Sequence, residues 1–178
     1  MSRVVFDSGH GMGNRKKGVW DPGAVAYGTE EAAVAWKWVL SLKFYLAKLG
    51  VDVGLTRQAF EEPCPLNSRR AASGELLVSI HCNSAASPKA NGAEVWVREY
   101  APEPTAEIAE DVCKVLASGR IGNRGIKTTT KLAVLKNSRM AMLLEIGFLS
   151  NAEDRGYITD DGYRKTICKR LADVLKEW

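Results

Sequence analysis

Hydrophobic and polar positions follow two different periods along this chain. Short apolar runs bounded by glycine or polar residues occur at residues 4–6, 76–80 and 142–146, and such runs are typical of buried strands. Longer stretches repeat apolar residues every three or four positions, from about Thr29 to Leu49 and again after Asp160. This second period is that of an amphipathic helix. The alternation of the two patterns predicts an α/β fold.

The rest of the pattern extends the same architecture. We expect strands at 51–56, 93–97 and 132–135, a short helix at 66–72, and a further helix that begins at Pro104 and Thr105. The segment from Gly9 to Gly28 has neither period and is predicted to be a long loop, which in a compact domain is usually functional. We therefore predict a single domain with a twisted, largely parallel central sheet of about six strands, flanked by helices on both faces.

Composition limits the classes of protein that remain. A chain of 178 residues is long enough to bury a core without disulfides. Four cysteines, at positions 64, 82, 113 and 168, form no Cys-x-x-Cys motif, so we expect free thiols and a reducing compartment. The first residues have no signal-peptide pattern, and no stretch reaches the roughly 20 apolar residues that span a bilayer. We expect synthesis in the cytoplasm and no membrane insertion.

Charge changes this picture little. The net charge is +4, and the basic residues are scattered while the aromatic residues lie mainly in helical stripes. No stacking platform for bases follows from that distribution, so we predict no nucleic-acid partner. The densest basic run, Arg15-Lys16-Lys17, is interpreted as a solvated loop.

Candidate chemistry centres on the two histidines of the chain. His10 and His81 each follow an apolar run, and a third run ends in Glu145. Ligands of sheet-based α/β folds gather beyond the strand ends, so the two imidazoles are expected to share a metal. Two histidines and a glutamate are suited to a hydrolytic zinc site. Taken singly, a histidine near a strand end is more often a hydrogen-bonded structural residue, and Glu145 fits a strand-end salt bridge equally well.

A catalytic zinc usually has three protein ligands, and the start of the long helix offers two glutamates for the third. Adjacent helical residues differ by about 100° in direction, so only one of the two faces inward. Glu31 is in register with the inner stripe of Val34 and Trp38, whereas Glu30 lies on the wetter side. Both acids also complement the positive end of the helix dipole, which explains Glu30 better than Glu31.

Several motifs occur in the order of one known family and cover nearly the whole chain: Asp7-Ser-Gly-His-Gly11, Asp21-Pro-Gly-Ala24, Gly28-Thr-Glu-Glu31, Leu55-Thr-Arg57, Ser79-Ile-His-Cys-Asn83, Asn123-Arg-Gly-Ile-Lys127 and Leu144-Glu-Ile-Gly-Phe-Leu-Ser-Asn151. On these motifs the chain resembles the zinc-dependent N-acetylmuramoyl-L-alanine amidases of autolysins and phage endolysins. The fifth and seventh motifs are the most specific. The family usually has proline or alanine where this chain has Ser8, and we expect that difference to change only loop stiffness.

The resemblance implies roles for individual residues. It places one zinc ion per chain on His10, Glu31 and His81, and makes Glu145 the catalytic acid–base. Asn83 shares a strand face with His81, and we expect it either to hydrogen-bond the substrate or to orient a ligand.

The same resemblance implies an activity and a setting. Residues 1–178 would form a zinc amidase catalytic domain with no separate wall-binding domain, acting as a monomer. The substrate would be peptidoglycan, cleaved between N-acetylmuramic acid and L-alanine with lysis of the cell wall. Because no signal peptide is recognised, release would depend on a phage or on lysis of the cell.

Two other readings of the residues stay open. A zinc carboxypeptidase-like peptidase acting on wall stem peptides would need a cation for a terminal carboxylate, and Arg124 offers one. A non-catalytic wall-binding module is the other reading, although an intact Glu145 beside three ligands argues against it. Release of single amino acids would favour the peptidase, and binding without release of any new amine would favour the module.

Overall fold

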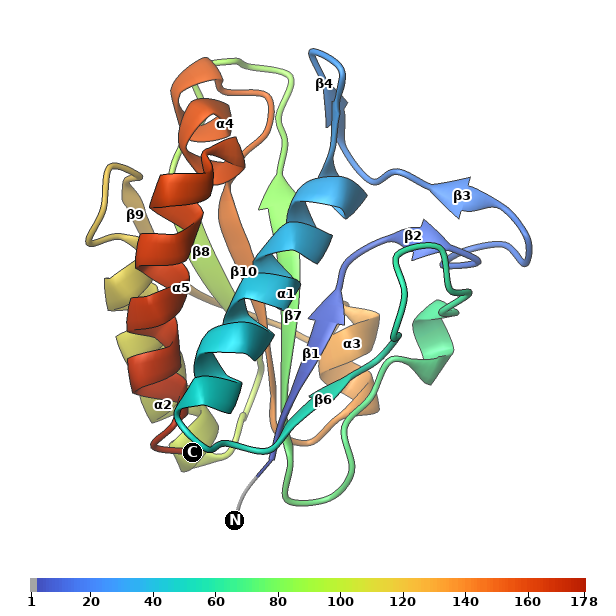
Figure 1. Ribbon diagram of the computed structural model, residues 1–178, viewed down its shortest axis with the longest axis vertical. Coiled ribbons are helices and arrows are strands. Elements are labelled where there is room, and N and C mark those ends of the chain that lie inside the picture. The colour runs from blue at the N-terminus through green and yellow to red at the C-terminus, as the bar shows by residue number, and fades with distance from the viewer. Residues whose placement is uncertain (1–2) are drawn as a thin grey trace.

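A six-stranded sheet forms the centre of the computed structural model, which describes residues 3–178 (Figure 1). Across the sheet the strands are β6 (Val53–Leu55), β1 (Val4–Ser8), β7 (Leu76–Asn83), β10 (Ala141–Phe148), β8 (Ala93–Arg98) and β9 (Asn123–Thr129). The first four are parallel, β8 runs antiparallel to β10, and β9 runs parallel to β8. The predicted six-stranded, largely parallel sheet is therefore confirmed.

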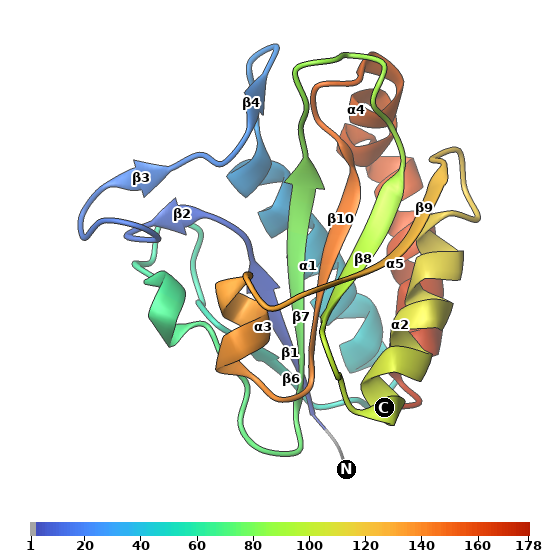
Figure 2. The ribbon, with the colours of Figure 1, turned by 180° about the vertical axis from the view of Figure 1, so that it is seen from behind.

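Helices lie on both faces of the sheet, but unequally. Helices α1 (Glu31–Lys48), α2 (Glu103–Leu116) and α5 (Asp161–Leu175) cover one face, with α4 (Ala152–Thr159) beyond one end of it (Figure 1). The opposite face carries α3 (Ala133–Asn137), seen in front of the sheet in Figure 2, and the single 3-10 turn η1 (Leu66–Ser68). None of the helices within residues 3–178 is long and apolar enough to cross a membrane.

The period of two along the strands produces two cores. Val78 and Leu144 face the thick helical layer, where they join Trp38 of α1 in the main cluster. Their neighbours Leu77 and Leu143 face α3 in a smaller cluster. Because helices cover both faces of the sheet, the amino-terminal halves of the strands carry apolar side chains on both sides. Towards their carboxyl ends the α3 face becomes polar, and the candidate chemistry lies there.

Two predicted elements are wrong in type or length. The apolar run at 132–135 belongs to α3, not to a strand, and the strand of that region is β9, which lies earlier in the chain. Val134 and Leu135 of α3 are buried in the smaller core, and a short buried helix has the same apolar run as a buried strand. The helix expected at 66–72 is only the three-residue turn η1.

Helix α4 was not predicted. It has no strong apolar stripe, and it begins at a cap, because the Asn151 side chain accepts hydrogen bonds from the backbone N–H groups of Glu153 and Asp154 at 3.0 Å.

The predicted loop from Gly9 to Gly28 contains one small hairpin and most of a second, which ends at Glu30. Strand β2 (Gly11–Met12) pairs with β3 (Trp20–Asp21), and β4 (Val25–Ala26) pairs with β5 (Thr29–Glu30). The two-residue turn Tyr27-Gly28 has positive φ at both positions, 50° and 76°, as a type I′ turn requires. This hairpin runs directly into α1 and so fixes where the first helical residue, Glu31, lies.

The cysteines give a test of the fold. All four are free and buried, and burial raises the pKa of the Cys82, Cys113 and Cys168 thiols. We expect a thiol reagent to react slowly with the native protein and to titrate four thiols in unfolded, unreduced protein. A count of two or none in the unfolded protein would contradict this arrangement.

Candidate functional site

Three side chains from distant parts of the chain meet near the carboxyl ends of β1 and β7. His10 follows β1, Glu31 begins α1 and His81 lies on β7, and one ligand-type atom of each lies within 4.8 Å of the others. Glu31 Oε2 is 3.1 Å from His10 Nε2, and Glu31 Oε1 is 2.8 Å from His81 Nδ1. Two imidazoles and one carboxylate are the protein donors of many catalytic zinc sites, so this donor set fits a zinc ion.

The position of His10 depends on a tight turn at the end of β1. His10 has a φ of 60° and Gly11 a φ of 94°, in the left-handed region. That conformation costs a non-glycine residue about 1–2 kcal/mol. The buried side chains of Arg57 and Arg69 each donate a hydrogen bond of 2.6 Å to the carbonyl oxygen of His10, which holds the turn in place.

The His10 ring is oriented by a carboxylate behind it. Nδ1 lies 3.1 Å from Asp21 Oδ2, and Asp21 also accepts hydrogen bonds from Asn14 Nδ2 at 2.6 Å and the Gly23 N–H at 3.0 Å. Burial opposes ionisation of Asp21, but these hydrogen bonds outweigh it and lower its pKa. An anionic Asp21 favours the proton on Nδ1, which leaves the lone pair of Nε2 directed to the cluster.

Glu31 is the buried centre of the cluster. Its carboxylate accepts hydrogen bonds from the backbone N–H groups of Ala24 at 2.8 Å and Cys82 at 3.0 Å, besides its contacts with both histidines. Burial opposes ionisation, but hydrogen bonds from the two histidines hold its pKa well below the usual range. Glu30 instead accepts a hydrogen bond of 3.0 Å from Trp20 Nε1. Glu31 therefore faces inward as the apolar stripe predicted, whereas Glu30 lies in β5 just before the helix and not on its wetter side.

Two glycines make room for these side chains. A β-carbon on Gly23 would lie 2.5 Å from Glu31 Oε2 and 2.6 Å from His10 Cδ2, and one on Gly9 would overlap the His81 ring. The cluster is thus packed directly against backbone.

Glu145 lies beside the cluster on β10, in register with His81 on β7. Burial raises its pKa to about 7, and the nearby charges of His81, which lowers it, and of Glu31, which raises it, act in opposite directions. Among residues 3–178, its buried Oε2 atom has no hydrogen-bond partner. A carboxyl group that titrates near neutrality and has a free oxygen is suited to proton transfer.

Asn83 and Arg124 are joined by a residue that the sequence did not single out. The buried carboxylate of Glu94 accepts hydrogen bonds from Asn83 Nδ2 at 3.1 Å, Trp96 Nε1 at 3.0 Å and Arg124 Nε at 2.7 Å. The alternating pattern of strand 93–97 placed Glu94 on one face but did not reveal these partners. Arg124 Nη1 also donates a hydrogen bond of 3.3 Å to the Asn91 carbonyl oxygen, and the guanidinium lies over the Phe148 ring, so most of this group already has partners.

A network of buried polar side chains around Asp7 lies beneath the cluster of His10, Glu31 and His81. Asp7 is fully buried and accepts hydrogen bonds from Thr56 Oγ1 at 2.6 Å, Ser79 Oγ at 2.7 Å and Arg69 at 3.0 Å. Burial opposes its ionisation, but the Arg69 charge and these hydrogen bonds lower its pKa. Ser8 accepts a hydrogen bond of 3.0 Å from Arg57, which corrects the expectation that this position affects only loop stiffness.

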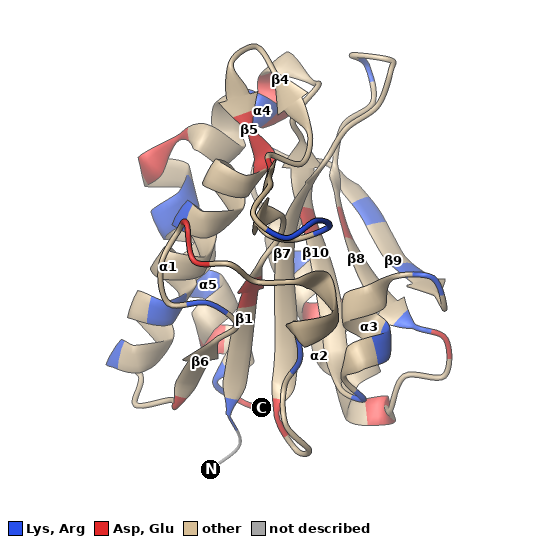
Figure 3. Ribbon diagram, turned by 90° about the vertical axis from the view of Figure 1, so that its right-hand side faces the viewer, with Lys and Arg blue, Asp and Glu red and all other residues tan. Residues whose placement is uncertain are grey.

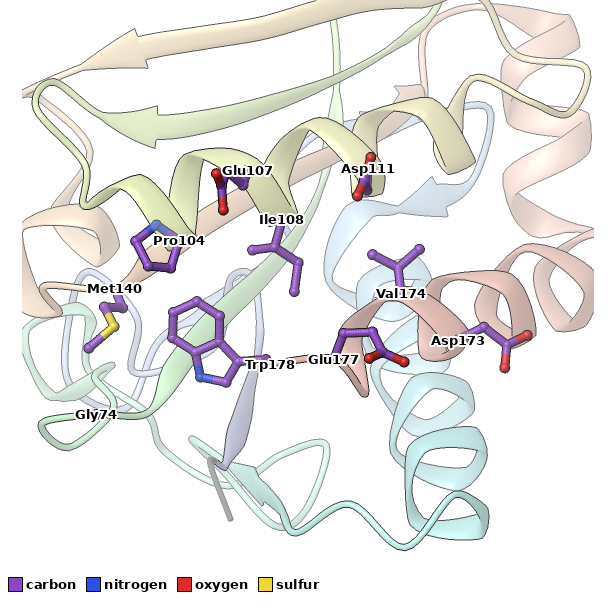
Figure 4. Close-up of a pocket in the computed structure, with 10 residues that line it drawn as sticks. All are labelled: Gly74, Pro104, Glu107, Ile108, Asp111, Met140, Asp173, Val174, Glu177 and Trp178. Atoms are coloured by element: carbon purple, nitrogen blue, oxygen red, sulfur yellow. The ribbon is translucent and has the colours of Figure 1, made fainter.

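Hollows open on both sides of the cluster. One of 240 Å³ lies towards α3 and one of 360 Å³ lies towards Asn83, and His10, His81 and Glu145 line both. A separate hollow of 630 Å³ lies at the other end of the sheet, where Gly74 precedes β7 and Met140 precedes β10 (Figure 4). Its lining combines the Trp178 ring with carboxylates of α2 and α5 and contains no histidine or cysteine.

Comparison with known proteins identifies the family. A family model described as N-acetylmuramoyl-L-alanine amidase matches residues 4–177. The chain belongs to this amidase family. The family predicted from the motifs is therefore confirmed.

Individual members of the family resemble the chain over nearly all of its length. The probable cell wall amidase LytH of Staphylococcus epidermidis is 27% identical over 175 residues, which cover 98% of this chain and 57% of the relative. LytH of Staphylococcus aureus is likewise 27% identical, over 97% of this chain and 57% of the relative. This amidase-family chain thus spans little more than half the length of these curated relatives.

Solved structures of amidases share the fold. The N-acetylmuramoyl-L-alanine amidase of Clostridium difficile 630 superposes with a TM-score of 0.86 at 25% identity, over 99% of this chain and 95% of the other. The catalytic domain of CwlV from Bacillus (Paenibacillus) polymyxa var. colistinus gives a TM-score of 0.81 at 26% identity, over 99% and 97%.

The buried ion pair beneath the site gives a prediction about stability. Replacing Arg69 by methionine removes the cation that pairs with the fully buried Asp7 and one donor to the His10 carbonyl. We expect Arg69→Met to lower the free energy of unfolding by about 3–5 kcal/mol, the usual cost of breaking a buried pair. Urea denaturation measures the change. The exposed neighbour provides a control, since Arg70→Met should stay within about 0.5 kcal/mol of wild type. Equal stability of the two variants would contradict the assigned role of Arg69.

Proposed function

We propose that this chain is a zinc-dependent N-acetylmuramoyl-L-alanine amidase. It hydrolyses the amide bond between the lactyl group of N-acetylmuramic acid and L-alanine in peptidoglycan. The main support is one arrangement: in a member of the amidase family, two histidines and Glu31 converge beside the buried, partly unpaired carboxyl group of Glu145.

His10, Glu31 and His81 hold one zinc ion per chain. When bound, the ion supplies a Lewis acid that polarises the amide carbonyl and lowers the pKa of a water molecule towards about 7. Asp21 keeps the His10 ring turned so that Nε2 is available, and the N–H groups of Ala24 and Cys82 hold the Glu31 carboxylate. The three donors are thus oriented before the ion arrives.

Glu145 carries the proton. Its free Oε2 accepts a proton from the attacking water and returns it to the alanine nitrogen as the C–N bond breaks. A pKa of about 7 suits both steps, because the group is a competent base and a competent acid near neutrality. Asn83 lines the hollow beside Glu145 and is held by Glu94, so we assign it to substrate positioning.

A peptidoglycan substrate implies that the chain acts at the cell wall. It acts there as a monomeric catalytic domain, and the expected phage- or lysis-dependent release stays a prediction. The peptidase reading is less favoured because two of the three guanidinium nitrogens of Arg124 already donate, to Glu94 and to the Asn91 carbonyl oxygen. Mass analysis of digested peptidoglycan separates the readings: an amidase releases whole stem peptides, a peptidase releases single amino acids, and a binding module releases neither.

The first functional prediction concerns the metal. His10→Ala, Glu31→Ala and His81→Ala each remove one of the three converging donors. We expect each variant to lose bound zinc and activity, measured by elemental analysis and by release of new peptide amines. Glu30→Ala is the matched control: its carboxylate contacts Trp20, so zinc and most activity should remain. Loss of zinc from Glu30→Ala with retention in Glu31→Ala would contradict the ligand set.

The second functional prediction separates chemistry from binding at Glu145. Glu145→Gln keeps the size of the side chain but removes the basic carboxylate. Zinc content and melting temperature should stay close to wild type, while hydrolysis falls by roughly 100-fold or more, the scale of general acid–base assistance. Near-normal cleavage would remove Glu145 from the mechanism. Loss of zinc together with activity would show that it is a ligand.

A further inference from the structure

Arg15 lies where three hollows around the cluster meet. It lines the hollows of 240 Å³ and 360 Å³ that contain His10, His81 and Glu145, and also a wider hollow of 950 Å³. The wider hollow shares Leu66 and Ala133 with the first. The three hollows thus adjoin one another around the cluster, and we call them together the trough, with Arg15 in the wall common to all three.

The Arg15 guanidinium is available to a ligand. Its side chain is 75% exposed, and its ion pair runs through Nε alone, 3.3 Å from Asp21 Oδ2. The two terminal nitrogens therefore face no acceptor among the described residues. Arg69, which also lines the first hollow, differs: all its nitrogens donate to Asp7 or to backbone carbonyls. A guanidinium with two free terminal nitrogens is suited to bidentate binding of a carboxylate.

The wider hollow is cationic. Lys17 lines it together with Arg15, whereas Lys16, between them in the sequence, lines none of the three hollows. Within the described part of the chain, no aspartate or glutamate lines the wider hollow. Figure 3 shows the basic stretch of this loop, in blue, in front of the sheet near β7 and β10. The solvated loop expected from the sequence is thus also a wall of the trough.

The two arms of the substrate differ in charge. The carboxyl group of the lactyl ether is consumed in the amide, so the N-acetylated sugar arm next to the scissile bond is neutral. The peptide arm carries free carboxylates. A cationic hollow on one side of the cluster therefore distinguishes the two arms electrostatically.

We propose that Arg15, with Lys17, binds a carboxylate of the stem peptide in the 950 Å³ hollow. This assignment rests on the proposed amidase function. It directs the sugar arm to the other side of the cluster, into the 360 Å³ hollow lined by Asn83 and Ser84.

The test uses two N-acetylmuramoyl peptides of the same sequence, one with free carboxylates and one with carboxamides. Wild type should cleave the carboxylate form with a kcat/KM about tenfold higher, on the scale of a charged hydrogen-bonded contact. Arg15→Gln should bring the ratio of the two kcat/KM values most of the way to one, with zinc content unchanged, and Lys17→Gln should lower the ratio to a smaller extent. Lys16→Gln is the matched control and should keep the wild-type ratio.

The outcomes distinguish this proposal from the function on which it rests. Equal cleavage of both substrates by wild type would overturn the role of Arg15 and leave the amidase function intact. Zinc-loaded wild type that cleaves neither substrate would overturn the proposed function and the subsite with it. If Arg15→Gln lowered both rates at an unchanged ratio, Arg15 would only support Asp21, and the proposal would be wrong.

Discussion

The site depends on the turn at His10. Two buried guanidinium groups, of Arg57 and Arg69, hold this turn by donating hydrogen bonds to the His10 carbonyl oxygen. Burying Arg57 and Arg69 next to each other is unfavourable: burial, and then repulsion by Arg69, lowers the pKa of Arg57. The fully buried Asp7 offsets that charge from the strand below. Because such an arrangement adds little net stability, we interpret it as a device that selects one conformation of the turn over others. A relaxed turn would move the His10 ring away from Glu31.

Most polar side chains around the cluster of His10, Glu31 and His81 already have hydrogen-bond partners within the protein. Asp21 anchors His10, backbone N–H groups anchor Glu31, and Glu94 anchors Asn83. Glu145 is one of three exceptions there among the described residues: its Oε2 is buried and unpaired, as are Asn14 Oδ1 and Arg57 Nε. A buried acceptor without a partner costs free energy, and on Glu145 it belongs to the group that we propose exchanges a proton.

Much of the fold and the central residues could be predicted, because they depend on local period and on residue type. The strand ends located His10, His81 and Glu145, and the helix stripe chose Glu31 over Glu30. Short segments were harder: the run at 132–135 is a helix because it packs on the thin face of the sheet, which no local pattern records. The roles of Arg57, Arg69 and Glu94 were also invisible, since each depends in part on a partner that lies 30 or more residues away in sequence.

The absence of side chains at Gly9 and Gly23 has a consequence for how this protein tolerates change. Neither residue has a functional group, yet a β-carbon at either one would enter the space that His81, His10 and Glu31 occupy. In a saturation-mutagenesis map both positions would look like catalytic residues. Engineering that varies the walls of the trough should therefore leave this backbone lining alone and diversify the exposed loop around Arg15 instead.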